Sequence, residues 1–142
     1  AMAQAQVTRA LCICTTMEEF AQVHGLAMAH DNIWATAGVH PDTEGLSEPS
    51  VDDLVALGQL PRVLAIGETG LDYFRLGTRT IADMEWQRER FRTHIRAARL
   101  LQAETGCPYG VDIAIDAGQA AGAAKTGAGK GRAGLSNVRQ WR

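Results

Sequence analysis

Apolar and polar positions divide this chain into segments that predict strands and helices in alternation. Continuous apolar runs at residues 10–14, 33–37 and 63–66 have the length and composition of strands buried on both faces of a sheet. After each run, apolar residues recur at helical spacing, over residues 17–28, 51–57 and 84–98. Alternating strands and helices are typical of parallel βαβ units, so we expect an α/β fold.

Capping residues mark the expected ends of these helices. A threonine at Thr15–Thr16 is placed to cap the first helix, and an apolar stripe from Met17 through Phe20 to Met28 follows it. A hydroxyl with an acid three residues later begins the next two helices, at Ser50–Asp53 and Thr80–Asp83. Gly106 is placed to end the last helix.

The stretch from residue 62 to residue 73 carries the first candidate for chemistry. Glu68 follows a buried apolar run directly and lies between Gly67 and Gly70, where the backbone can turn sharply. Active sites of α/β folds lie at the carboxyl ends of parallel strands. The pattern therefore predicts a metal ligand or a general acid or base. The residues alone also allow a loop cap or a pairing with a nearby arginine.

Composition bounds the class of protein. The chain has 142 residues, 46% of them hydrophobic and 21% charged, as in an ordinary globular domain. A complete (β/α)₈ barrel needs about 250 residues. The net charge of −2 argues against a protein that coats nucleic acid. No apolar run approaches the length of about eighteen residues that crosses a membrane, so we expect no membrane partner and a cytoplasmic location. We interpret Cys12, Cys14 and Cys107 as reduced core thiols.

The composition changes after residue 106, which divides the chain into residues 1–106 and 107–142. Residues 109–115 could form one more short strand, whereas residues 117–134 are mostly Ala and Gly. Such a segment buries little apolar surface, so we expect it to be flexible. No acid follows Asp116, and basic residues do: Lys125, Lys130, Arg132, Arg139 and Arg142. A weak nucleic-acid-binding module acting through this basic tail is one alternative function, and a fragment without activity is another.

Three short segments together resemble a known family. Residues 38–41 read Gly-Val-His-Pro, residues 67–73 read Gly-Glu-Thr-Gly-Leu-Asp-Tyr, and residues 87–91 read Gln-Arg-Glu-Arg-Phe. In this order and spacing they resemble the TatD family of metal-dependent hydrolases and deoxyribonucleases, over roughly the first hundred residues. The resemblance implies a partial TIM-barrel-like (β/α) fold, divalent metal ions (Mg, Mn or Zn) at the carboxyl ends of its strands, and DNA as the substrate.

The resemblance assigns one metal ligand, Glu68, which matches the glutamate of the family. The His-x-His of the family's first strand, its two later histidines and its late aspartate have no counterpart in this sequence. A metal needs several ligands that converge from different strands. We therefore expect a truncated, impaired hydrolase without a complete catalytic site.

Two further residues are candidates for supporting roles, and several others are assigned none. His40 is expected at a strand end next to that of Glu68. There it could contact a substrate phosphate, hydrogen-bond a residue that binds the metal or the substrate, or hydrogen-bond the loop backbone. Asp72 is expected to bond loop amides, or less simply to orient Glu68. Other polar residues are interpreted as helix surface or as partly buried without chemistry: His24, His30, His94, Arg88, Arg90, Arg92, Arg96 and Arg99.

Overall fold

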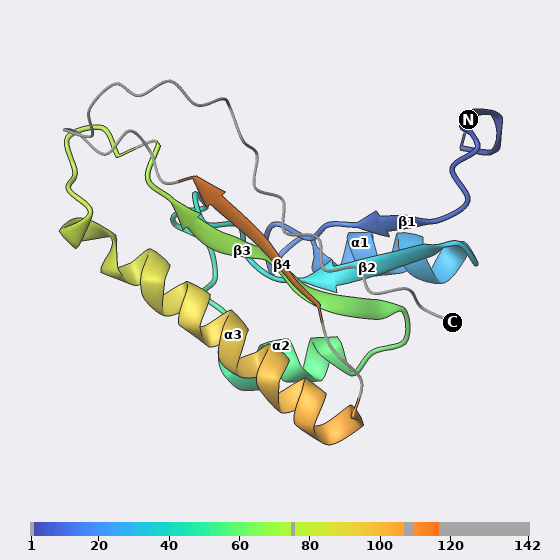
Figure 1. Ribbon diagram of the computed structural model, residues 1–142. Helices are drawn as coiled ribbons and strands as arrows, with labels where there is room; N and C mark the ends of the chain where they lie inside the picture. The colour runs from blue at the N-terminus through green and yellow to red at the C-terminus, as the bar shows by residue number, and fades with distance from the viewer. Residues whose placement is uncertain (1, 75, 107–109, 117–142) are drawn as a thin grey trace, which may run out of the picture.

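The computed structural model describes residues 2–74, 76–106 and 110–116 (Figure 1). Four parallel strands form one sheet in the order β1-β2-β3-β4. The strands are β1 (Ala10–Cys12), β2 (Ile33–Ala37), β3 (Val63–Asp72) and β4 (Gly110–Asp116). The helices are α1 (Phe20–Ala29), α2 (Val51–Gly58) and α3 (Glu85–Thr105), with short 3₁₀ turns η1 (Ala3–Ala5) and η2 (Ala82–Met84). The predicted α/β fold of parallel βα units is confirmed.

The helices connect neighbouring strands and pack on the sheet. α1 packs on β2, α2 packs on β3 and on α3, and α3 packs along β3 with further contacts to β4. Figure 1 shows the long α3 running alongside β3, with α2 between α3 and the start of β3. Because every strand runs in the same direction, the carboxyl ends of all four meet at one rim. That rim is where an α/β fold places its chemistry.

The sequence pattern predicts the bounds of β2 correctly but not those of β1 and β3. β2 has the predicted bounds, whereas β1 ends at Cys12 rather than at residue 14. β3 continues past the predicted end at Ile66 to Asp72. The apolar run marked only the first part of β3, because the strand continues, still largely buried, through Gly67, Thr69 and Gly70. β4 forms where residues 109–115 were expected to add a strand.

The capping predictions hold for α2 and fail for the start of α1. The hydroxyl of Ser50 accepts the Asp53 amide and the Asp53 carboxylate accepts the Ser50 amide, which is the predicted capping box. The threonines instead close a turn: Thr16 accepts the Glu19 amide, and Glu19 accepts from the amide and hydroxyl of Thr15. α1 therefore begins at Phe20, after that turn.

The third helix ends as predicted and begins through an extra turn. Thr80 donates to the Asp83 carboxylate through its amide and hydroxyl, but Asp83 belongs to η2, and α3 begins only at Glu85. Gly106 adopts the left-handed conformation and its amide bonds the Gln102 carbonyl, which ends α3 as expected.

The core lies between the sheet and the helices. Its buried members include Phe20, Leu54, Ile66 and Leu101, with small residues from β2 among them. Met28, expected on the apolar stripe of α1, is 52% exposed, so that prediction was wrong.

Cys12 and Cys14 are free thiols, and burial raises the pKa of Cys14. Cys107 and the Ala/Gly-rich segment with its basic residues lie outside the described residues. Within the described part, no helix is long and apolar enough to cross a membrane.

Candidate active site

Glu68 lies at an irregularity inside β3 rather than just beyond its end. β3 pairs with β4 up to Ile66, the register then shifts, and pairing resumes at Thr69. The Glu68 amide instead donates to the Cys14 carbonyl at 2.9 Å, in the segment that follows β1. The expectation of a carboxylate placed directly after the strand was therefore wrong in one respect. The glycine-flanked stretch interrupts the ladder without ending the strand, and this exposes the Glu68 side chain in part.

His40 reaches the same place from the loop after β2. Its amide donates to the Thr15 carbonyl at 2.9 Å, so consecutive carbonyls of residues 14 and 15 hold Glu68 and His40. His40 Nε2 lies 3.7 Å from Glu68 Oε1, and both side chains are about a quarter exposed, at 24% and 28%. The sequence placed these two residues level with each other in a parallel sheet, and the structure brings them together at one rim.

A close approach between two backbones sets the distance between these residues. A Cβ atom at Gly38 would lie 2.6 Å from the carbonyl carbon of Gly67 and 2.8 Å from its Cα. Those distances are shorter than side-chain carbons tolerate, so only glycine lets the end of β2 lie directly on β3 here. Gly38 and Gly67 immediately precede the segments that carry His40 and Glu68. The glycines thus bring the two functional side chains within reach of each other.

Asp42 is a member of the site that the sequence did not single out. Its carboxylate lies against His40 Nδ1, which leaves Nε2 directed toward Glu68. A carboxylate on one ring nitrogen fixes the orientation of the ring and the nitrogen at which it can bind or donate elsewhere. The spacing of an acid two residues after a histidine, across a proline, was the available signal.

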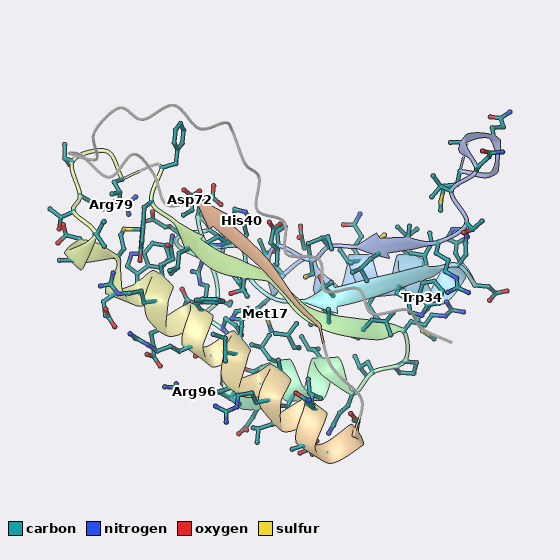
Figure 2. The ribbon with its side chains drawn as sticks, in the orientation of Figure 1. Met17, Trp34, His40, Asp72, Arg79 and Arg96 are labelled. Carbon is teal, nitrogen blue, oxygen red and sulfur yellow. The ribbon has the colours of Figure 1, made fainter. Side chains whose placement is uncertain are left out.

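Asp72 lies at the far end of β3 and bonds the loop, as the sequence predicted. Its Oδ1 accepts the Phe74 amide at 2.9 Å, which shapes the turn after the strand. Its own amide donates to Gln87 Oε1 at 2.8 Å. Figure 2 shows His40 and Asp72 at the same end of the sheet, whereas Trp34 lies at the opposite end.

Three polar residues on α3 contact the loop that carries His40, and the sequence interpretation missed them. Gln87 Nε2 donates to the Pro41 carbonyl at 2.8 Å, Arg90 Nη1 donates to the His40 carbonyl at 2.7 Å, and His94 Nε2 accepts the Val39 amide at 3.0 Å. All three side chains are buried. Their spacing matches the apolar residues of the same helix, and that periodicity was the signal that could have found them.

His94 was interpreted as a surface or partly buried residue and is fully buried. Desolvation by burial lowers the pKa of His94 to about 4, because the protein interior disfavours the charged imidazole. The nearby Arg90 guanidinium lowers the pKa further, whereas the carbonyl of Arg90 and the Glu48 carboxylate oppose the shift. His94 is therefore neutral at pH 7.

Arg90 was also assigned to the solvated surface and is buried. Its guanidinium pairs with both carboxylate oxygens of Glu48 and lies 4.9 Å from the centre of the Trp86 ring. The surface interpretation holds for Arg92 and Arg96, whose exposed side chains pair with Glu85 and Glu89. Arg88 pairs with Glu85 but is partly buried.

The donors at the rim suit a divalent cation in kind but not in number. Glu68 offers a carboxylate oxygen and His40 an imidazole nitrogen, both common ligands. Asp42 faces the other ring nitrogen, so the two carboxylates flank His40 rather than converge on one point. Among the side chains that the structure describes, no group of three or more His, Cys, Asp or Glu residues could hold a metal ion. These residues alone do not form a metal site.

Comparisons with known proteins agree with the motifs and the fold. The model of the family described as TatD related DNase matches residues 1–111. The 3′-5′ ssDNA/RNA exonuclease TatD of Salmonella typhimurium is 37% identical over 89 residues, 62% of this chain and 33% of that protein. The protein of the same name from Edwardsiella piscicida is 49% identical over 63 residues, 43% of this chain and 24% of that protein.

A solved structure extends the agreement to three dimensions. The crystal structure of YJJV, a TatD homologue from Escherichia coli K12, has a TM-score of 0.61 to this chain at 30% identity. The match covers 70% of this chain and 38% of that one. The chain spans about a third of the length of the curated relatives it matches. Its parallel βα units are those of a partial TIM barrel, and the chain belongs to the family of TatD-related DNases.

Proposed function

We propose that the rim around Glu68 is part of a metal-dependent hydrolase site that cleaves phosphodiester bonds in single-stranded nucleic acid. The observation that carries the proposal is the approach of Glu68 Oε1 to His40 Nε2, at 3.7 Å, beside the carboxyl ends of β1 and β2. Relatives of this chain bear the name 3′-5′ ssDNA/RNA exonuclease, which supports the same class of substrate.

Each residue of the rim has a distinct role in this proposal. Glu68 is a ligand of a divalent metal ion, Mg, Mn or Zn, whose other ligands come from parts of a barrel beyond the four described strands. When bound, such an ion would lower the pKa of a water molecule that attacks the phosphorus. His40, oriented by Asp42, directs Nε2 toward a phosphate oxygen beside Glu68. Asp72 holds the loop after β3 through the Phe74 amide.

Alternative explanations for Glu68 have less support. The Arg62 guanidinium, a nearby candidate for pairing, bonds carbonyls at the opposite end of β2 and the Asp31 carboxylate. Arg90 pairs with Glu48 instead. The Glu68 side chain thus faces an imidazole at the rim, which favours a role in binding over one in ion pairing.

We expect little or no nuclease activity from this chain by itself. Two donors from the described residues fall short of the three protein ligands that catalytic zinc sites use. A 5′-labelled single-stranded DNA, incubated with the purified chain and Mg²⁺ or Mn²⁺, should therefore remain close to intact. Cleavage that Glu68→Ala abolishes would contradict this expected impairment while supporting the role of Glu68.

Metal binding tests the role of Glu68 directly. Titration with Mn²⁺, followed by the electron paramagnetic resonance signal of the free ion, should show weak binding that Glu68→Gln reduces severalfold. Glu104→Gln is a matched control, because Glu104 is an exposed glutamate near the end of α3 that bonds Gln59. Equal Mn²⁺ binding by the original chain and by Glu68→Gln would refute the proposed ligand role.

A further inference from the structure

We propose that α3 sets the position of His40 through three buried side chains, Gln87, Arg90 and His94, which act as positioning residues for the candidate site. This inference rests on the proposed function only in taking His40 to be part of that site. It concerns residues that neither the family resemblance nor the expected metal ligands assign a role.

The three side chains hold three consecutive residues of one loop. Gln87 bonds the Pro41 carbonyl, Arg90 bonds the His40 carbonyl, and His94 bonds the Val39 amide. The order along α3 is the reverse of the order along the loop, so the helix and the loop lie antiparallel. Contacts to three consecutive residues fix both the direction of the loop and its position along α3, which a single contact would not.

Helix geometry makes this alignment possible. Positions i, i+3 and i+7 lie on one face of an α-helix, separated along its axis by about 4.5 and 6 Å. An extended chain advances about 3.3 Å per residue. The helix positions are thus farther apart than successive loop residues, and long side chains such as Gln and Arg are flexible enough to make up this difference in spacing. The face of α3 that covers β3 therefore presents its polar groups in step with residues 39–41.

The burial of these groups argues against a purely space-filling role. Gln87 and His94 are fully buried and Arg90 is 5% exposed. Apolar residues at these positions would fill the same volume without the cost of removing polar groups from water. Each polar group instead meets one backbone group of the loop, and Gln87 also bonds both backbone polar groups of Asp72. The helix thus ties the His40 loop to the end of β3.

His94 has only one arrangement of hydrogens that satisfies both of its contacts. Its Nε2 accepts the Val39 amide, so this nitrogen carries no proton, and its Nδ1 then donates to the Arg90 carbonyl at 2.8 Å. A glutamine can also place an acceptor near the Val39 amide, whereas a leucine fills the space without one. These two substitutions separate the hydrogen bond from the packing.

Nuclear magnetic resonance of the labelled full chain at pH 7 tests the inference, with no metal or nucleic acid present. In His94→Leu, we expect the Val39 amide to exchange with solvent at least about tenfold faster, because its acceptor is lost. The ring signals of His40 should shift, and the nuclear Overhauser effect between that ring and Glu68 should weaken. His94→Gln should restore all three readouts, while amides of the core, such as Leu54, stay unchanged.

Two outcomes would overturn the inference. Ring signals and Val39 exchange in His94→Leu that match the original chain would show that α3 does not position the loop. Equal changes in His94→Gln and His94→Leu would show that packing, not the acceptor, is responsible.

If His94→Leu does not fold, Arg90→Lys supplies the test, because an ammonium group donates from a single nitrogen and cannot reproduce the bonds that three guanidinium nitrogens make to Glu48 and the His40 carbonyl. Unshifted His40 ring signals in Arg90→Lys would also refute the inference. The NMR measurement reports only the position of the loop, with no metal or substrate present. Failure of this test would therefore not refute the proposed metal role of Glu68, and absence of nuclease activity would not refute the positioning role of α3.

Discussion

The two faces of α3 carry similar polar residues but make different contacts, ion pairs on the outer face and hydrogen bonds to a loop on the inner face. The outer face has arginines and glutamates, Arg88, Arg92 and Arg96 with Glu85 and Glu89, joined in ion pairs. The inner face has Gln87, Arg90 and His94 against the loop that carries His40. Figure 2 shows Arg96 on the side of α3 that faces away from the sheet, whereas His40 lies at the rim.

Exposure decides what each polar contact contributes. The side chains of Arg92 and Arg96 are 47% and 56% exposed, whereas that of Arg90 is 2% exposed. Hydrogen bonds from Arg92 and Arg88 lower the pKa of Glu85, and those from Arg96 and Arg92 lower that of Glu89. Water and salt screen such pairs, so they stabilise the fold little. A buried polar group that loses its partner has no water to replace it.

The largest effect should follow removal of Gln87. Gln87→Leu keeps a similar volume but removes the bonds of the Asp72 amide, the Asp72 carbonyl and the Pro41 carbonyl to this side chain. Each buried group left unpaired costs about 1–3 kcal/mol, so the free energy of unfolding should fall by about 4 kcal/mol. Chemical denaturation measures this. Gln102→Leu, the same change at an exposed position of α3, is the control and should leave stability nearly unchanged. Equal effects of the two substitutions would refute the distinction between the faces.

The sequence predicted the frame of the fold well because strands and helices depend on local patterns. β2, the capping box of α2 and the glycine that ends α3 follow from residues within one turn or one strand. The start of α1 did not, because a threonine can cap a turn as well as a helix, and Glu19 selects the turn. The end of β3 did not, because pairing with β4 continues the strand through its glycines.

The site was predictable only where a motif marked it. Glu68 and His40 were paired from their places at strand ends, and the structure brings them together. Gln87, Arg90 and His94 act through contacts with residues 46 to 55 positions away, so the periodicity of α3 can indicate that they are buried but not which loop they contact. Asp42 contacts its near neighbour His40, and only the spacing of the two residues marked it. An arginine on a helix with glutamates nearby reads as surface, and only the loop packed over Arg90 makes it a buried residue.

The next largest effect is a loss of stability at low pH, which we expect from His94 on the inner face of α3. An unfolded histidine has a pKa of about 6.5, whereas His94 in the folded chain has a pKa of about 4. Above pH 6.5 both states are neutral at this ring and stability is full. As the pH falls, the unfolded state takes up the proton first, so stability is lost between about pH 6.5 and pH 4. The loss should reach about 3 kcal/mol by pH 4.

Denaturation curves measured at several pH values test this expectation. His94→Gln has no ring to protonate, so its stability should fall much less over the same range. The groups that face His94, Arg90 and Glu48, remain in that variant. A slope in His94→Gln equal to that of the original chain would assign the pH dependence to other groups.

A smaller loss should follow replacement of the buried arginine. Arg90→Gln removes the paired bonds to Glu48 and the bond to the His40 carbonyl. Glu48 is 53% exposed and regains water, so only the His40 carbonyl and the space left by the guanidinium remain uncompensated. We expect the free energy of unfolding to fall by about 2 kcal/mol, measured by thermal or chemical denaturation. A loss below experimental error would mean that the loop does not depend on this contact.

The smallest effect is expected two positions further along the same helix. Arg92→Gln removes ion pairs to both Glu85 and Glu89, more partners than many surface arginines have. The side chain is nevertheless half exposed, and Glu85 and Glu89 keep Arg88 and Arg96 as partners. The free energy of unfolding should therefore match that of the original chain within error, both at low salt and at 1 M salt. A loss as large as that of Arg90→Gln would show that the ion-pair network, rather than burial, makes the arginines of α3 important, because the two substitutions differ only in the face of the helix that they change.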